Sequence, residues 1–512
     1  MRANPARPST FSGRFAKIAG RVAMAILGWP FLTGAAAAAE KNGVEAVRAA
    51  GNAAPAVRFA VRELYAPGHF GNSYEVMGPR EMRRYLAEAK HWGFNRYGDW
   101  FDMEDCSDPF ADKSLVRLGD AMWERKKENF RSAQRLGFTC DLLITPNHVY
   151  VDQCRPELLA TKGKRIFGQL ICPSNPKARA IILKNYQHLF ADLAAAGVRL
   201  KAISSCPYDF GGCACPKCQP WILTFAKLMR EIHALAERYH PGVESHMIGW
   251  WWTAEEHRLL ADWADREAPG WIKSIYLHIP YNATHVADVP LPKGCRRGAF
   301  VHIGYSDASG KSRDIYGHLG PVVAPGRLPR TIQGLANSGV TAVMAYSEGV
   351  FDDVNKALLA GLASGQFNSA HEVLRAYAER YFAANPRQAE GWATWLAGWG
   401  EPFAVDPEKA AQQLAVLNPT AAGPWRQQQW QKKLELFRLQ QVIAGGTAWT
   451  PERLQAVDQF WQVQEEIQRG LWGLTAQRHV FARRYTPVAW YEDWAKHATA
   501  EKKTLDKEQQ WR

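Results

Sequence analysis

Three acidic residues each come directly after an apolar run of the chain. At such a position a buried strand ends and its next side chain can reach the surface. They are Asp209, Asp307 and Glu348. Two carboxylates at one site can cleave a glycosidic bond, one protonating the leaving oxygen and the other acting as nucleophile or activating water. We therefore expect Asp209 and Glu348 to be the two catalytic carboxylates, and Asp307 is a third candidate.

Each carboxylate also has a purely structural interpretation. Asp209 would cap its own loop by accepting backbone N–H groups. Glu348 would supply negative charge to the start of the next helix, a role that Asp352 and Asp353 can also fill. Asp307 lies in GYSDASGKSRD, which is polar enough to be an ordinary loop.

Other polar and aromatic residues stand at the ends of the same apolar runs. Such side chains hydrogen-bond to hydroxyl groups and stack on sugar rings, so we expect them to bind substrate. Arg62 is the predicted clamp on a hydroxyl or carboxylate, with pairing to Glu63 or Asp99 as the alternative. The predicted binding set is Arg62, Glu63, Asp99, Trp100, Asn147, His148, Tyr208, Trp250, Trp252, His278, Tyr281, Asn282, Tyr305 and Tyr346.

A cysteine cluster follows Asp209 closely. Cys206, Cys213, Cys215 and Cys218 place four sulfurs within thirteen residues. Four thiolates are the ligands of a structural zinc ion, whereas disulfides would staple the same loop. Both interpretations stay open, and neither makes a cofactor necessary for catalysis. The nine cysteines suit an exported protein, in which disulfides persist.

The elements that must position these residues alternate between short β-type runs and amphipathic helical stretches. Alternation of this kind implies a parallel sheet, and eight repeats match a (β/α)8 TIM barrel, which we place at residues 55–362. In such a barrel the residues after each strand share one rim. The predicted strands are 57–64, 94–100, 139–145, 198–204, 244–252, 272–279, 299–305 and 341–346.

The remainder, residues 363–512, shows helical patterns without a strand signal and predicts an all-helical C-terminal domain. Aromatic and aliphatic residues recur at helical spacing there, and we interpret them as core. The predicted helices are 370–384, 387–399, 407–417, 424–443, 451–472 and 490–505.

The first 39 residues have the layout of a secretory signal peptide, with cations, a short apolar run and an A-x-A site. An uncleaved anchor helix is the alternative. We expect a bacterial protein exported to the periplasm or the medium, without integral membrane association after cleavage. Removal of the five cations of this segment lowers the net charge from +13 to +8, and the remaining excess forms no dense Lys/Arg tract, which argues against nucleic-acid binding.

Two motifs carry a resemblance to a known group of enzymes. PYDFGGCACPKCQPW and YSEGVFDDVNKALLAGLASG resemble those of exported bacterial (β/α)8 glycoside hydrolases, distantly similar to β-hexosaminidases and α-glucuronidases. The resemblance implies a carbohydrate substrate. Hexosaminidase-type enzymes carry an adjacent acidic pair after the fourth strand, and Phe210 stands where the second acid would be.

The expected function is therefore exported glycoside hydrolysis of a glycan. A catalytically silent carbohydrate-binding barrel is the alternative, and Phe210 favours it. A metal-dependent deacetylase or lyase is less well supported, because the sequence shows no His/Asp ligand motif.

Overall fold

The computed structural model describes residues 59–66, 78–111, 118–209, 211–279, 283–307, 319–347, 351–417, 425–445 and 448–472. The chain divides into Met1–Ala54 and Pro55–Arg512, and all described residues belong to the second unit. The predicted signal peptide, the predicted helix 490–505, and Phe210, Tyr281, Asn282 and Glu348 lie outside the described residues.

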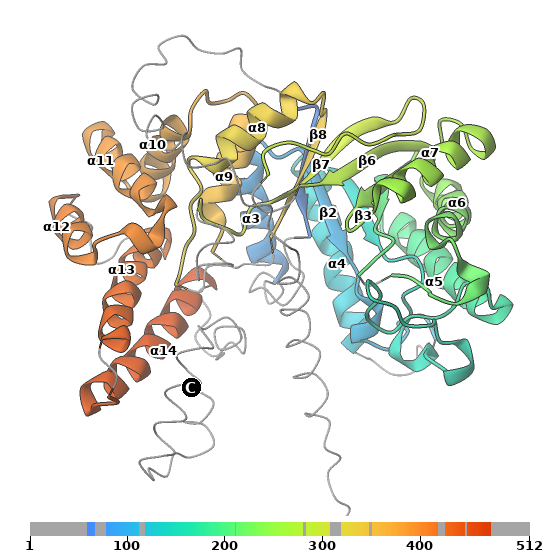
Figure 1. Cartoon of the computed structure of the whole chain (residues 1–512), viewed down its shortest axis with the longest axis horizontal. Coiled ribbons are helices and arrows are strands. Elements are labelled where there is room, and N and C mark those ends of the chain that lie inside the picture. The colour runs from blue at the N-terminus through green and yellow to red at the C-terminus, as the bar shows by residue number, and fades with distance from the viewer. Residues whose placement is uncertain are drawn as a thin grey trace, which may run out of the picture. The chain divides into compact units, whose positions relative to one another are not determined.

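Eight parallel strands close into a barrel in sequence order, and β1 pairs with β8 to complete it (Figure 1). The predicted barrel is confirmed, and each predicted strand overlaps an observed one. The strands are β1 Val61–Tyr65, β2 Arg96–Trp100, β3 Thr139–Ile144, β4 Leu200–Ser205, β5 Glu244–Gly249, β6 Ile272–His278, β7 Arg296–His302 and β8 Ala342–Tyr346.

Amphipathic helices follow most strands, and Figure 1 shows them outside the sheet. One of them, α7, was not predicted, although a capping box of Thr253 and Glu256 starts it. The described part of the β6–β7 connection, residues 283–295, contains no helix. The helices are α3 Pro79–His91, α4 Leu118–Arg135, α5 Pro176–Ala195, α6 Trp221–Tyr239, α7 Ala254–Glu267, α8 Arg327–Asn337 and α9 Asp353–Ala363.

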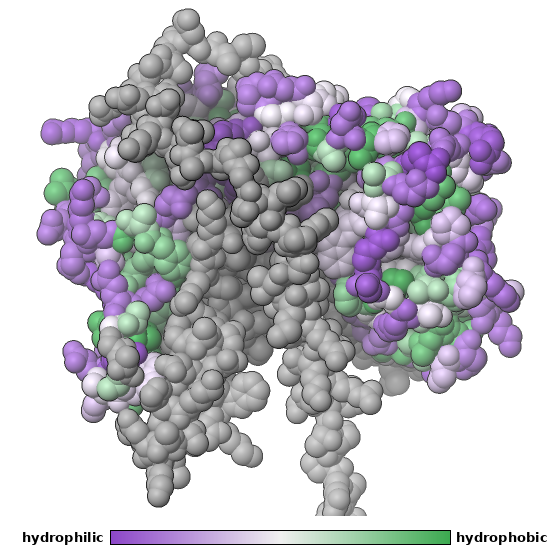
Figure 2. All heavy atoms as spheres, viewed as in Figure 1, coloured by the Kyte–Doolittle hydropathy of each residue, from purple (hydrophilic) through white to green (hydrophobic). Residues whose placement is uncertain are grey.

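The C-terminal region is helical, as predicted. Its described helices are α10 Ala370–Tyr381, α11 Pro386–Ala397, α12 Pro407–Leu417, α13 Trp425–Ala444 and α14 Pro451–Trp472. Trp430, Leu434 and Phe437 of α13 are buried, which confirms their interpretation as core. Figure 2 shows hydrophilic residues mixed with smaller apolar areas on the face it displays, as amphipathic helices leave outside.

Two apolar clusters result from this architecture. The larger one fills the space between the sheet and its surrounding helices. The smaller one lies inside the barrel and contains Tyr65, Trp100, Phe300 and Tyr346. Among the described residues, no helix combines the length and apolar character needed to cross a membrane.

Candidate functional site

The carboxyl ends of the barrel strands converge on a set of aromatic and histidine side chains, which we call the barrel mouth. Five of its members are the last residue of a strand, and Trp250 follows β5 directly. Four were predicted to bind substrate from their place in the sequence, Tyr65 and His302 being the additions. The barrel mouth consists of Tyr65, Trp100, Trp250, His278, His302 and Tyr346.

Ring contacts hold the barrel mouth together across the strands. The ring centroids of Trp250 and His278 are 4.3 Å apart, and those of Tyr65 and Tyr346 are 5.4 Å apart. The indole Nε1 of Trp250 is buried without a hydrogen-bond partner among the described residues. Because a buried donor without a partner is costly, this N–H is suited to a polar ligand atom.

The two histidines of the barrel mouth contact each other through their Nε2 atoms, 3.2 Å apart. Burial lowers the pKa of His278 to about 4. Burial, followed by the neighbouring His278 and Arg327, lowers the pKa of His302 well below its usual value. Both rings are therefore neutral near pH 7, and one donates a hydrogen bond that the other accepts.

Asp209 lies beyond the end of β4 in a backbone conformation that glycine normally adopts, with φ of 75°. Its N–H donates to Arg165 O at 3.0 Å, and its carbonyl accepts from Phe167 N at 2.7 Å. A non-glycine residue held at positive φ costs about 1–3 kcal/mol and persists only where neighbouring structure enforces it. Here the loop after β3 enforces it by pairing with Asp209 like a short strand.

The half-buried Asp209 lies close enough to Tyr65 and Cys206 for its charge to act on both. Burial is the main reason that the pKa values of Tyr65 and Cys206 are raised, and the negative charge of Asp209 raises both further. Asp209 therefore lies within electrostatic reach of the barrel mouth, as predicted for a catalytic carboxylate. The assignment of catalysis itself stays a prediction.

Arg165 is a residue that the sequence reasoning missed. Its guanidinium makes a bidentate ion pair with Glu256, with Nη1 2.9 Å from Oε2 and Nη2 2.8 Å from Oε1. It also donates to the carbonyl of Trp251 and to the hydroxyl of Tyr208, the latter at 2.9 Å. Arg165 thereby joins the loops after β3, β4 and β5. A single arginine in the polar segment TKGKRIFG gives no sequence signal for this role.

Tyr208 and Trp252 lie in these joined loops. The hydroxyl of Tyr208 bonds to both Arg165 and Glu256. The hydroxyl of Tyr208 therefore already has hydrogen-bond partners within the protein. Trp252 packs against His257, with ring centroids 4.7 Å apart, and its buried Nε1 has no hydrogen-bond partner among the described residues. Trp252 is the better placed of the two to donate to a ligand.

His148 lies between two carboxylates. Its Nδ1 is 3.4 Å from Asp102 Oδ1, and its Nε2 is 3.1 Å from Glu104 Oε2. Burial by itself would raise the pKa of Glu104, but the hydrogen bond and charge of His148 lower it below the usual value. One nitrogen and two oxygens are possible metal ligands, and the contacts of the ring with both acids also hold His148 in place without a metal.

Arg62 and Asp99 are corrections to the predicted binding set, because both point out of the barrel. The guanidinium of Arg62 donates to the carbonyls of Gly93 and Phe59, which precede β2 and β1 at the amino ends of the strands. Asp99 accepts from Lys126 of α4 at 2.6 Å. Side chains alternate along a strand, so a position one residue from the inward set faces the helices.

Glu63 faces inward but lies below the barrel mouth, in a buried polar layer near the amino ends of the strands. Burial, and next the charge of Asp141, raises the pKa of Glu63 well above its usual value. A Cβ atom at Gly98 would come within 2.2 Å of Glu63 Oε1, so glycine makes room for this carboxyl. Glu63 is therefore part of the interior rather than of the rim.

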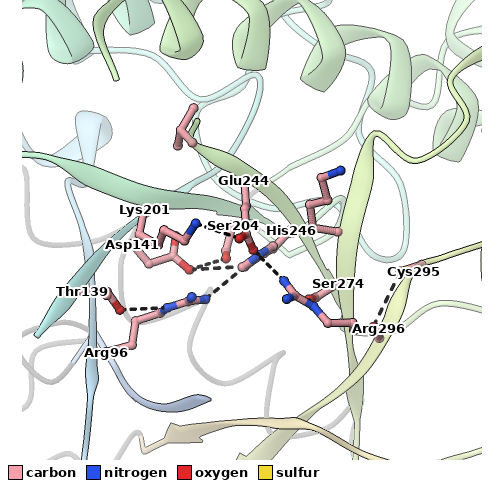
Figure 3. Close-up of polar contacts among 12 residues, drawn as sticks. Arg96, Thr139, Asp141, Lys201, Ser204, Glu244, His246, Ser274, Cys295 and Arg296 are labelled. Carbon is pink, nitrogen blue, oxygen red and sulfur yellow. Dashed lines mark hydrogen bonds and ion pairs between the residues drawn. The ribbon is translucent and has the colours of Figure 1, made fainter. Parts of the chain in front are cut away.

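Figure 3 shows the rest of this layer, which spans β2 to β7. Arg96 Nη1 lies 3.4 Å from His246 Nδ1, and His246 Nε2 lies 3.0 Å from Glu244 Oε2. Arg296 Nη2 donates to Glu244 at 2.6 Å, and Ser204 Oγ donates to Asp141 at 2.5 Å. Most of these groups bond to one another, although Asp141 Oδ1 and both carboxyl oxygens of Glu63 have no hydrogen-bond partner among the described residues. We interpret the layer as the polar floor of the barrel.

The side chains of Asp307 and Asn147 form hydrogen bonds with backbone groups. The oxygens of Asp307 accept from Gly326 N at 3.0 Å and Arg327 N at 2.7 Å, where α8 begins. Asn147 donates to the carbonyls of Ile171 and Gly212 and accepts from Gly212 N at 3.0 Å. These contacts favour structural roles over the predicted catalysis and substrate binding. Tyr305 is buried beside the mouth, its ring centroid 6.0 Å from that of His302.

The cysteine cluster differs from the predicted one by one member. Cys172, Cys213, Cys215 and Cys218 bring their sulfurs within 4.8 Å of one another. Cys206 instead packs against the apolar cluster inside the barrel, because it directly follows β4 on the inward face. All nine cysteines lie in the described part of the chain, where none forms a disulfide bond.

Among known proteins, only solved structures are similar to this chain. No protein-family model matches the chain, and no curated protein sequence does. The O-GlcNAc hydrolase of Thermobaculum terrenum is 12% identical, with 87% of this chain and 97% of that one covered and a TM-score of 0.44.

Two further neighbours are also enzymes of carbohydrates. A GH5_18 enzyme of Streptomyces cattleya, in complex with GlcNAc, is 12% identical over 72% of this chain and 98% of its own, with a TM-score of 0.36. The α-amylase of Geobacillus thermoleovorans, complexed with acarbose, is 11% identical over 60% and 77%, with a TM-score of 0.36. The similarity to glycoside hydrolases is distant, and values this low do not bear on substrate or mechanism.

Proposed function

We propose that this chain is an exported glycoside hydrolase that cleaves a glycan with Asp209 and Glu348 as its working carboxylates. The observation that carries the proposal is the placement of Asp209. Its backbone is forced to φ of 75° by pairing with the loop after β3, and its carboxylate acts on Tyr65 and Cys206 inside the barrel. Strain of this kind clusters at active sites.

The surroundings of Asp209 suit a sugar. Trp100, Trp250 and Tyr346 supply aromatic faces at the ends of three strands, and Trp250 Nε1 is a buried donor without a partner in the described chain. Aromatic faces with a few placed donors are the usual lining of carbohydrate sites. Glu348 follows the end of β8 by two residues and is proposed from the sequence as the second carboxylate.

In this mechanism one carboxyl group protonates the glycosidic oxygen as the bond to the sugar breaks. The other attacks the sugar or activates water on the opposite face. A separation of about 5–5.5 Å between the two carboxyl groups would give retention of configuration, and about 6.5–9.5 Å would give inversion. The neutral His278–His302 pair would donate or accept hydrogen bonds at the same end of the barrel.

Activity on a panel of aryl-glycosides and glycans tests the proposal. Asp209→Asn and Glu348→Gln should each lower kcat by about 10²–10⁴-fold on any substrate found, with the fold retained by circular dichroism. Asp288→Asn is the matched control, because the side chain of Asp288 is fully exposed at 100%. Unchanged turnover in both variants removes these carboxylates from the mechanism. Glycan binding without turnover by the unaltered protein would establish the carbohydrate-binding alternative.

A further inference from the structure

Four cysteines from two different loops meet in the structure, and one of these loops also carries Asp209. Cys172 comes from the connection between β3 and α5, and Cys213, Cys215 and Cys218 come from the connection between β4 and α6. Their sulfur atoms all lie within 4.8 Å of one another. Cys213 and Cys218 are buried, and the other two are half-buried.

The spacing of the sulfurs identifies the kind of site. Cys172 Sγ is 3.7 Å from Cys215 Sγ and also 3.7 Å from Cys218 Sγ. A tetrahedral zinc ion with Zn–S bonds of about 2.3 Å places its sulfurs roughly 3.8 Å apart. A disulfide requires about 2.05 Å, and Cys172 can form one with only one of its two equidistant neighbours.

We propose that Cys172, Cys213, Cys215 and Cys218 bind one structural Zn²⁺ ion. Four thiolates complete a tetrahedron and leave no position open for water or substrate, which is the mark of a structural rather than catalytic zinc. Ser174 Oγ lies 2.9 Å from Cys218 Sγ, and a hydrogen bond from it orients that ligand as outer-shell partners of metal sites do.

The zinc ion would fasten the two loops whose pairing sets the conformation of Asp209. Ala214, between Cys213 and Cys215, donates its N–H to Thr161 O at 2.9 Å, and Gly212 donates its N–H to Asn147. Arg165–Phe167 then pairs with Asp209. Cys172 follows the paired residues of one loop and Cys213 follows Asp209 in the other, so the cluster joins the two loops just beyond this pairing. The effect on catalysis rests on the proposed function, whereas zinc binding itself does not.

The experiment measures metal and thiols in the full-length protein purified without chelator. Elemental analysis should find about one zinc per chain, and a thiol reagent should titrate all nine cysteines of the denatured, unreduced protein. Replacing zinc by Co²⁺ should give the intense visible absorption of tetrahedral cobalt–thiolate centres. Metal-free protein whose intact mass shows these cysteines in disulfides would overturn the proposal.

Two cysteine variants fix the ligand set. Cys172→Ser should lower the zinc content several-fold, whereas Cys206→Ser, the matched control, should retain about one zinc per chain. The reverse result would contradict the assignment. If Cys172→Ser does not fold, Cys172→His provides the second arm, because a Cys₃His set still binds zinc and should restore folding and metal.

Zinc binding and the proposed function can fail separately. Full zinc content in a protein inactive on every glycan tested leaves the metal site standing and removes the hydrolase. Turnover by a zinc-free, disulfide-bonded protein does the opposite.

Discussion

The guanidinium of Arg165 lies over the ring of Tyr208, with Cζ 3.7 Å from the ring centroid, while the same group makes a bidentate ion pair with Glu256. Three barrel loops therefore share one cation. Cation–π contact and a bidentate carboxylate pair both depend on the planar shape of arginine, so lysine is a poor replacement at this position.

Arg165→Lys should destabilise the fold by about 1–3 kcal/mol, because Glu256 and the carbonyl of Trp251 lose donors in a partly buried setting. Urea unfolding measures the change. Arg258→Lys is the matched control, since Arg258 also forks onto a glutamate but is 53% exposed, and it should stay within about 0.5 kcal/mol of the unaltered protein. Equal losses in the two variants would contradict the role given to Arg165.

The strain at Asp209 can be measured apart from its chemistry. Asp209→Gly and Asp209→Ala both remove the carboxylate, but only glycine adopts φ of 75° without a Cβ penalty. The glycine variant should be the more stable by about 1–2 kcal/mol in denaturant unfolding. Equal stability of the two variants would mean that the backbone there is not strained.

The barrel mouth should make stability depend on pH. The pKa of His278 is lowered to about 4 in the folded state by burial, against about 6.5 when unfolded. The unfolded chain therefore binds more protons between these values. The stabilisation is complete above about pH 6.5 and is lost as pH falls towards 4.

His278→Gln tests this dependence. It should reduce the slope of the unfolding free energy against pH in that window by up to about 1.4 kcal/mol per pH unit. His371→Gln is the control, because His371 is half exposed on α10. An unchanged slope in His278→Gln would show that this ring is not buried neutral.

The barrel and the C-terminal helices are joined by an ion pair. Asp353 at the start of α9 accepts from Arg426 of α13 and from Tyr377 of α10, the last at 2.6 Å. Arg426→Met should destabilise by about 3–5 kcal/mol, because it leaves a buried carboxylate uncompensated. Asp353→Leu combined with Arg426→Met should recover much of that loss in the same unfolding experiment. A double variant as unstable as the single one would show that the pair contributes more than charge compensation.

The strands were predictable because buried parallel strands are continuous apolar runs between helical patterns. The pattern does not resolve on which face of a strand a single side chain lies. Arg62 and Glu63 are neighbours, yet one points to the helices and the other into the barrel, and a strand end misplaced by one residue reverses both. The strand predicted at 244–252 ends at Gly249, where the chain turns through Trp251 at φ of 59°.

The sequence also does not predict contacts between residues that are far apart in the chain. The spacing of Cys213, Cys215 and Cys218 marks a cluster, but its fourth member, Cys172, lies 41 residues before Cys213. Cys206 is nearer to these three in sequence, so spacing alone points to Cys206 rather than to Cys172. Only the barrel order, which brings the loops after β3 and β4 side by side, identifies the correct residue.

The pairing of Arg165–Phe167 with Asp209 bears on how such a protein can be re-engineered. Loops on a rigid scaffold carry binding and catalytic residues and tolerate changes in sequence. Here the loops after β3 and β4 share backbone pairing and the cysteine cluster, and Arg165 ties the loop after β5 to both, so the three loops form one structural unit. Grafting any one of them alone should disrupt the other two, whereas transplanting all three together would carry the geometry of Asp209 into a new barrel.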